Sequence, residues 1–179
     1  MAAGMHDTTD LEQPCWYALH TRAKHEKFIG DQLLQKGVHT FVPTVQQIHR
    51  WSDRSRAVDV PLFSCYVFVH DVFSRAHVPV MRTPGVFRWI GPNGRPAAIP
   101  DSQMDAVRSL IEKNVPVSPH AFLEVGQRVR IRGGSLDGLE GILIEKKSEH
   151  RLIISVDLIQ QSLAITVDGY ELERVQPET

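Results

Sequence analysis

The side chains most able to do chemistry in this chain are its nine histidines and two cysteines. Cys15 and Cys65 stand apart, without the C-x-x-C pairs of zinc or redox sites, so we expect free, reduced thiols. The histidines lack the short pairings of zinc sites, since even His20 and His25 have a spacing that does not stack on one helix face. No G-x-S-x-G, H-E-x-x-H, P-loop or G-x-G-x-x-G motif occurs. The sequence therefore predicts a protein that is not an enzyme and uses no cofactor or metal.

A cluster of basic residues between positions 20 and 56 favours nucleic-acid binding instead. This window carries seven Lys or Arg residues against three Asp or Glu residues. In its R-W-S-D-R-S-R run, Trp51 stands among the guanidinium groups of Arg50, Arg54 and Arg56. An aromatic ring in such company can stack on a base while the charges neutralise phosphates. The alternative is an ordinary charged hairpin tip, and so few contacts would in any case give weak, salt-sensitive binding.

A second signal is the V-P-L-F-S-C-Y-V-F-V run at residues 60–69, which is apolar on both faces of one strand. A sheet with helices on one side should leave its other side exposed to solvent. A strand with apolar side chains on both faces therefore suggests an interaction surface. A central strand covered on both faces is the alternative. Periodicity alone does not choose between the two.

The elements that must position these residues follow from hydrophobic periodicity and turn residues. In the first half we expect a strand at 16–20, a helix at 21–36, two strands at 40–49 and 58–70 that pair as an antiparallel hairpin, a short helical piece, a strand at 86–90 and a helix at 100–113. This order predicts an α+β fold with an antiparallel sheet and helices on one face.

The second half reads as a small all-β module. Five short apolar runs predict strands at 125–132, 139–146, 151–157, 162–167 and 171–175. Gly133, Gly134 and Gly138 supply the positive-φ positions of a tight turn after the first of them. Five strands in so short a stretch predict a small β-barrel with little core, suited to docking and not to holding a substrate in a deep pocket.

Charge divides the 179 residues into two unlike halves. The net charge is -1, but residues 1–114 hold 13 basic and 11 acidic residues, whereas residues 115–179 hold 7 and 10. We expect a polar lead at 1–13, a first domain at 14–113, a linker at 114–124 and a second domain at 125–179. The near-neutral net charge of the whole chain argues against an autonomous DNA-binding protein.

No apolar stretch approaches the roughly 20 residues that span a bilayer, and the start of the chain lacks the basic-then-apolar pattern of a signal peptide. We therefore expect a cytoplasmic protein with no membrane contact.

Four segments taken in order resemble the NusG family of transcription elongation factors. They are WYALHTRAKHE at 16–26, PLFSCYVFV at 61–69, RTPGVFRWIG at 82–91 and VGQRVRIRGGSLDGLEGILIE at 125–145. The last resembles a KOW motif, in which Gly134, Gly138 and Gly141 are the glycines. The resemblance implies a NusG N-terminal (NGN) domain with a ferredoxin-like sheet, followed by a flexible linker and a KOW domain with an SH3-like barrel.

The resemblance also implies where polymerase binds. In this family the NGN domain crosses the RNA polymerase cleft and sets an apolar patch on the clamp helices of the largest subunit. The matching residues here are Phe63, Tyr66 and Phe68, which favours the exposed-surface interpretation of their strand. Arg75 and His77 match a segment that lies near the opposite polymerase jaw. Bridging the cleft disfavours its opening, which suppresses pausing and termination through tighter binding to the closed state.

Further partners follow from the same resemblance. Arg22, Lys24 and His25, at the start of the first helix, match residues near the non-template DNA strand, which the hairpin tip could also contact. The KOW domain of the family recruits a ribosomal small-subunit protein or termination factor Rho. The resemblance thus implies a monomeric elongation and antitermination factor. The rival from another class is an RNA- or ribosome-binding KOW protein with no polymerase role.

Two departures from the family pattern bear on which member this is. Ser64-Cys65 stands where the family often has Pro-Gly, and Gly134-Ser135-Leu136 replaces the usual Gly-Pro-Phe of the KOW turn. Both favour specialised paralogues of the RfaH and UpxY kind, which are operon-specific antiterminators, and both weaken the case for Rho recruitment. The Ile- and Val-rich strands of the second half favour a permanent barrel.

Overall fold

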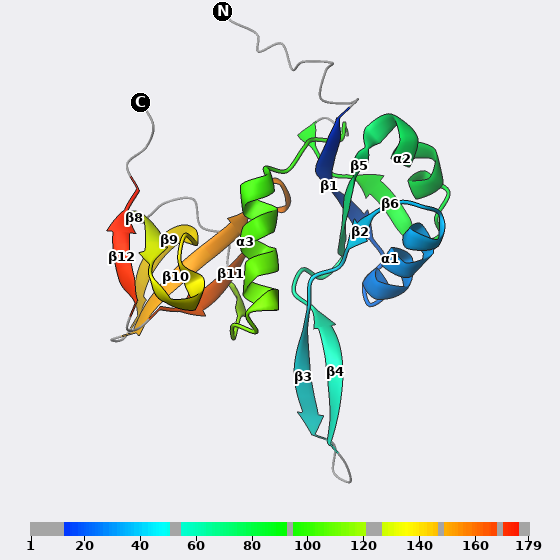
Figure 1. Ribbon diagram of the computed structural model, residues 1–179. Helices are drawn as coiled ribbons and strands as arrows, with labels where there is room; N and C mark the ends of the chain where they lie inside the picture. The colour runs from blue at the N-terminus through cyan, green and yellow to red at the C-terminus, as the bar shows by residue number, and fades with distance from the viewer. Residues whose placement is uncertain are drawn as a thin grey trace, which may run out of the picture. The chain divides into compact units, whose positions relative to one another are not determined.

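The computed structural model describes residues 13–50, 55–92, 95–120, 127–146, 149–167 and 170–175. The chain forms two compact units that interleave along the sequence (Figure 1). The first unit draws on Met1–Val42 and Ser64–Asp101, and the second on Pro43–Phe63 and Ser102–Thr179. The chain therefore passes into the second unit after Val42, returns to the first unit after Phe63, and enters the second unit again after Asp101.

The first unit is a four-stranded antiparallel sheet with two helices. Its strands lie in the order β2-β5-β1-β6, and they are β1 (Pro14–Thr21), β2 (Thr40–Phe41), β5 (Tyr66–Val72) and β6 (Val86–Trp89). Helix α1 (Glu26–Gln35) connects β1 to β2, and α2 (Phe73–Met81) connects β5 to β6. The chain order strand, helix, strand, strand, helix, strand with this sheet order is the ferredoxin-like arrangement. The predicted fold class is confirmed.

The core of this unit lies between the sheet and its two helices, which cover the same face in Figure 1. Alternate residues of β1 and β5 point into it, among them Tyr17, Leu19, Val67 and Val69. The helices contribute fully buried side chains in return: Ile29 and Leu33 from α1, and Ala76 and Val80 from α2. Each large apolar side chain buried in this way stabilises the fold by about 1.5–3 kcal/mol.

The predicted antiparallel pairing of residues 40–49 with 58–70 is confirmed, but each of the two runs breaks into two strands. Strand β3 (Thr44–Arg50) pairs with β4 (Ser55–Pro61) as a separate two-stranded sheet, while β2 and β5 join the four-stranded one. Pro43 separates β2 from β3, since proline has no N–H to donate to a ladder. Cys65 separates β4 from β5, since its φ of 70° is left-handed and a strand does not continue through it.

The second unit contains a six-stranded antiparallel sheet. Its order is β12-β8-β9-β10-β11-β7, and the strands are β7 (Ser118–His120), β8 (Gln127–Arg132), β9 (Glu140–Lys146), β10 (Glu149–Val156), β11 (Gln161–Thr166) and β12 (Glu171–Arg174). The meander from β8 to β11, with β12 returning beside β8, reproduces the five predicted strands. Val129, Ile131, Leu152 and Leu163 are among its buried side chains.

Two features of this unit differ from expectation. The predicted linker at 114–124 contains β7, whose Ser118 pairs with Ala164 of β11, while residues 121–126 lie outside the described residues. Helix α3 (Asp101–Glu112) packs with this unit, because the side-chain amide of Gln103 donates to the Asp157 carboxylate at 2.8 Å and accepts the Asp157 backbone N–H at 3.1 Å. The domain boundaries at 14–113 and 125–179 stay a prediction, because packing does not test whether the separated pieces fold.

Gly141 holds β9 and β10 in close contact. A Cβ at this position would collide with the Ile153 carbonyl oxygen and would lie 2.9 Å from the Leu152 Cγ atom. The other two glycines of the predicted KOW motif have a different role, since Gly134 and Gly138 have φ values of 70° and 82° in the turn between β8 and β9. The requirement at 141 is therefore space, and at 134 and 138 it is backbone conformation.

Replacing Gly141 by alanine should lower the free energy of unfolding by about 3 kcal/mol, because the new methyl group overpacks a backbone contact that cannot yield. Urea unfolding of the full chain measures it. The control is Gly133→Ala, where φ is 73° but no atom lies within 4 Å, and where only the left-handed cost of about 1 kcal/mol applies. Equal stability of the two variants would show that β9 and β10 can separate without cost.

Candidate functional site

The three residues predicted to contact DNA lie on one short loop between β1 and α1. Arg22 and Lys24 are exposed, and His25 is half-buried. The loop is tied to the turn before β6, since the Arg22 backbone N–H donates to the Gly85 carbonyl at 2.8 Å. Within the loop, the His25 Nδ1 atom lies 3.0 Å from the Ala23 carbonyl oxygen. The helix begins at residue 26 and not at the predicted 21, because β1 continues to residue 21 and Lys24 has a φ of 63°.

A buried carboxylate that sequence analysis missed fixes this loop to the turn before β5. Glu26 is 2% exposed, and its Oε1 atom accepts the Cys65 backbone N–H at 2.7 Å. The carbonyl of the same cysteine accepts the Thr21 backbone N–H at 2.8 Å. Cys65 occupies the place of the glycine in the family's Pro-Gly, and its positive φ of 70° is the conformation glycine adopts without strain. The presence of Ser64-Cys65 in place of the family's Pro-Gly was the sequence signal that marked this turn as unusual.

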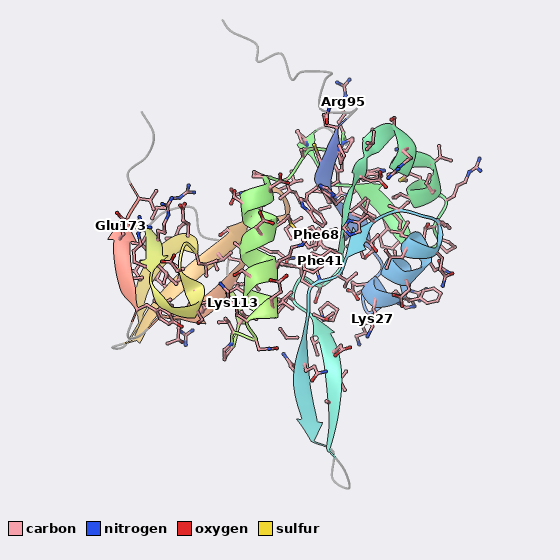
Figure 2. All side chains as sticks on the ribbon, in the orientation of Figure 1. Lys27, Phe41, Phe68, Arg95, Lys113 and Glu173 are labelled. Atoms are coloured by element: carbon pink, nitrogen blue, oxygen red, sulfur yellow. The ribbon has the colours of Figure 1, made fainter. Side chains whose placement is uncertain are left out.

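The expectation of an exposed apolar patch at Phe63, Tyr66 and Phe68 is wrong for two of the three residues. Phe63 is 1% exposed, Phe68 is fully buried and Tyr66 is half-buried. Strand β5 is an interior strand that pairs with β1 on one side and β2 on the other, and both of its faces are covered. Phe63 moreover belongs to the second unit, whereas Tyr66 and Phe68 belong to the first. Figure 2 shows Phe68 next to Phe41, its partner across β2 and β5.

Aromatic rings line the face of the sheet opposite α1 and α2, and sequence analysis missed most of them. The Trp16 ring lies 4.8 Å from that of His70. At the other end of the same face, the His20 ring lies 5.9 Å from that of Tyr66 and 5.5 Å from that of Phe87. Phe87 is 57% exposed, so this row ends in a ring open to solvent.

The two predicted jaw residues lie on α2. The Arg75 Nε atom donates to the Asp71 Oδ1 atom at 2.8 Å, and the two side chains form an ion pair in which the carboxylate is buried and the guanidinium is mostly exposed. His77 is exposed, and its ring stacks at 17° and 6.3 Å on that of Trp89. The structure therefore brings both residues to one short helix and anchors each by a buried partner.

The hairpin tip falls largely outside the described residues. Trp51 and Arg54 lie in the segment that is not described. The backbones of Arg50 and Arg56 end the ladder of β3 and β4, where they pair with Ser55 and His49. The predicted DNA contact of this tip stays a prediction.

Two arginines of β8 in the second unit are paired with carboxylates. The Arg130 Nε atom donates to the Glu140 Oε1 atom at 2.7 Å, and this hydrogen bond and the charge of Glu140 raise the pKa of the Arg130 guanidinium above its ordinary value. Arg132 forms an ion pair with Glu173. Two of the three arginines on β8 are thus neutralised locally, which makes this strand a poor phosphate-binding surface.

Within the described ranges, no three His, Cys, Asp or Glu side chains come together in a way that could hold a metal ion. A groove of about 720 Å³ lies between α3 and the second unit's sheet, lined by polar residues such as Ser102 and Asp137 and by apolar ones such as Leu139 and Ile153. None of the described helices has the length and apolar character needed to cross a membrane.

Replacing Cys65 by glycine should leave the free energy of unfolding unchanged or raise it by up to about 1 kcal/mol, because glycine relieves the left-handed backbone cost. The matched control is the same substitution at Cys15, which lies in β1 and packs against the helix-side core. Cys15→Gly should lower stability by about 1 kcal/mol or more, because glycine is unfavourable in a strand. Thermal unfolding measures the stability of both variants. A larger loss of stability at position 65 than at position 15 would contradict the backbone strain inferred at Cys65.

Comparison with known proteins now adds to this geometry. Residues 14–108 match the NusG family model, described as transcription termination factor nusG. The transcription termination/antitermination protein NusG of Escherichia coli K12 is 27% identical over 137 residues, covering 74% of this chain and 76% of the relative. The NusG protein of Borreliella burgdorferi is 24% identical over 186 residues, covering 89% and 98%.

Among solved structures, one described as domain interaction in Thermotoga maritima NusG superposes with a TM-score of 0.54 at 20% identity. It covers 93% of this chain and 99% of its own, which supports the shared fold. The matched segment 14–108 contains the whole ferredoxin-like sheet, both of its helices and the loop that carries Arg22 and Lys24. This chain belongs to the NusG family.

Proposed function

We propose that this chain is a transcription elongation factor that binds RNA polymerase, bridges its cleft and suppresses pausing and termination. The observation that carries the proposal is the family match over 14–108, the segment that holds every predicted contact residue of the first half. The relatives are named as transcription termination/antitermination proteins, which agrees with this role and with a chain that is not an enzyme.

The charge of the first unit supports contact with nucleic acid inside such a complex. Its described residues include eight Lys or Arg and four Asp or Glu. Two of the four acids, Glu26 and Asp71, are buried and hydrogen-bonded. The exposed surface of this unit therefore has a larger excess of basic over acidic residues than the unit as a whole. Arg22 and Lys24 are the exposed cations on the loop that we propose faces the non-template strand.

Polymerase binding is proposed at the residues that match the family's apolar patch. Of these, Tyr66 is half-buried and has surface open to a partner, whereas Phe63 and Phe68 are buried. Half-buried aromatic side chains in well-packed surroundings are typical of interface hot spots. Arg75 and His77 are proposed to contact the opposite jaw.

The second unit is proposed to recruit a further partner through its KOW domain, either a ribosomal small-subunit protein or Rho. The rival function, RNA binding by this unit alone, is less well supported, because Arg130 and Arg132 are paired with carboxylates.

We further propose a specialised, operon-specific factor of the RfaH and UpxY kind, on the strength of Ser64-Cys65 and Ser135-Leu136. Polymerase-associated occupancy confined to a few operons would support that assignment, and occupancy on all transcribed genes would contradict it.

Replacing Tyr66 by alanine should weaken capture of core RNA polymerase by about tenfold or more, the loss typical of an aromatic hot spot. Pull-down of the full chain with core polymerase measures it. The matched control is Phe28→Ala, which removes an exposed ring from α1 on the other face of the sheet. Wild-type protein that fails to bind polymerase would rule out the proposed function.

Charge reversal at Arg22 and Lys24 should reduce pause suppression by more than half while polymerase capture changes less than about twofold, because exposed contacts to phosphates add modest affinity each. An in vitro transcription assay with a defined pause measures it. Reversal of two other exposed cations, Arg95 and Lys113, makes the same change in net charge and should have little effect. Equal loss of capture and pause suppression would show that the loop contacts polymerase and not DNA.

A further inference from the structure

We propose that His39 and His70 form a binding site for one divalent transition-metal ion of the Zn²⁺ class, at the Trp16 end of the first unit's sheet. The site does not depend on the proposed function, because it uses none of the residues proposed to contact polymerase or DNA. The two histidines lie far apart in the sequence, so the short spacings typical of zinc sites could not reveal them as a pair.

The register of β2 and β5 places the two histidines opposite each other. Thr40 pairs with Val69 in this antiparallel ladder, so the position before β2 lies across from His70. The His70 backbone N–H donates to the His39 carbonyl at 2.9 Å, which continues the pairing by one residue. Side chains directly opposite on antiparallel strands lie on the same face of the sheet. The two imidazole rings are therefore neighbours in space.

The separation of the two rings suits shared coordination of one ion. Their centres lie 5.9 Å apart, and their planes meet at 83°. With metal–nitrogen bonds of about 2.0–2.1 Å, two imidazoles on one ion have ring centres about 4.5 Å apart at a right angle and about 6.4 Å apart in a line. A tetrahedral angle requires about 5.2 Å, which a small side-chain rotation from the observed positions provides.

Trp16 supports the pair from one side. It pairs with His70 in the ladder of β1 and β5, and its ring lies 4.8 Å from that of His70 and 6.0 Å from that of His39. Trp16 is 3% exposed, whereas His70 is half-buried and His39 is exposed. The indole therefore packs beside both imidazoles while solvent reaches the pair. An ion can enter from solvent without unfolding of the sheet.

The donor set decides which ions fit. Imidazole nitrogen is a good ligand for Zn²⁺, Cu²⁺ and Ni²⁺, whereas Mg²⁺ and Ca²⁺ take oxygen ligands. Among the described residues, no third His, Cys, Asp or Glu joins the two histidines in a group that could hold a metal. Water would fill the remaining positions, so the affinity should be lower than that of a closed four-ligand structural zinc site.

An ion at this place would fasten an edge strand to the sheet. Strand β2 is two residues long and pairs with β5 only at Thr40 and Phe41. Coordination by His39 and His70 would add a link at the end of this short ladder. A ligand that binds the folded chain and not the unfolded one raises stability, so the ion should raise the temperature of unfolding.

The test is isothermal titration of the full chain with ZnCl₂, with MgCl₂ as the control salt. Wild-type protein should bind Zn²⁺ saturably and should not bind Mg²⁺. His39→Gln and His70→Gln should each weaken Zn²⁺ binding about tenfold or more, since loss of even an outer-shell partner costs about 10–100-fold. The matched control is His20→Gln, which removes a half-buried histidine from the same face of the sheet and should bind Zn²⁺ as wild type does.

Tryptophan fluorescence locates the ion. Cu²⁺ binds nitrogen sites more tightly than Zn²⁺ does and quenches nearby indoles, so it should quench part of the emission from the three tryptophans. Trp16→Phe should lose this saturable quenching and still bind Zn²⁺. Thermal unfolding separates loss of the site from loss of the fold. Without metal, His39→Gln should unfold at the wild-type temperature, because residue 39 is exposed, and Zn²⁺ should raise the unfolding temperature of wild type alone.

Four outcomes would overturn the site. They are wild-type protein that shows no saturable binding at millimolar Zn²⁺, binding that is unchanged in either histidine variant, equal loss of binding in His20→Gln, and Cu²⁺ quenching that persists in Trp16→Phe. The polymerase pull-down is a separate measurement without added metal. Failure of the metal site would therefore leave the proposed function standing, and failure of that function would leave the metal site standing.

Discussion

The structure of the first unit depends on the position of β5 between β1 and β2. This strand pairs along its whole length with β1 on one edge and over two residues with β2 on the other, and buried side chains lie on both of its faces. Val67 and Val69 enter the core with α1 and α2, while Phe68 fills the opposite face. Because β1 is paired along most of its length with β5, the same strand also sets the direction of the loop that follows β1.

Entry into β5 is controlled by one strained residue. Cys65 turns the chain with a left-handed backbone, and its N–H and carbonyl are both used, by Glu26 and Thr21. These two hydrogen bonds join the start of β5, the end of β1 and the start of α1 at one point. The loop carrying Arg22 and Lys24 therefore projects from a rigid base, which is how binding loops are commonly supported. A buried carboxylate with no chemical role in the proposed function thus has a positioning role.

Much of this fold could be predicted from the sequence, because periodicity reports burial. The five strands of the second half were predicted to within a few residues, since their alternation and turn glycines agree. The antiparallel pairing of 40–49 with 58–70 was predicted correctly, but the breaks at Pro43 and Cys65 were not, because an apolar run does not reveal the residues that interrupt it. Burial of Phe63 and Phe68 was mispredicted because period-two patterning cannot tell which faces another element covers. Phe87 was missed since a bulge depends on register, which only pairing between distant strands defines.

The central claim is that the Tyr66 end of this sheet lies against RNA polymerase during elongation. Site-specific photocrosslinking from a benzophenone amino acid at position 66, in a reconstituted elongation complex, tests it most directly, with the same group at position 28 as the reference. The account predicts a crosslink from position 66 to the largest polymerase subunit and none from position 28. Equal crosslinking from both positions, or none from position 66 while the protein stays bound, would contradict it.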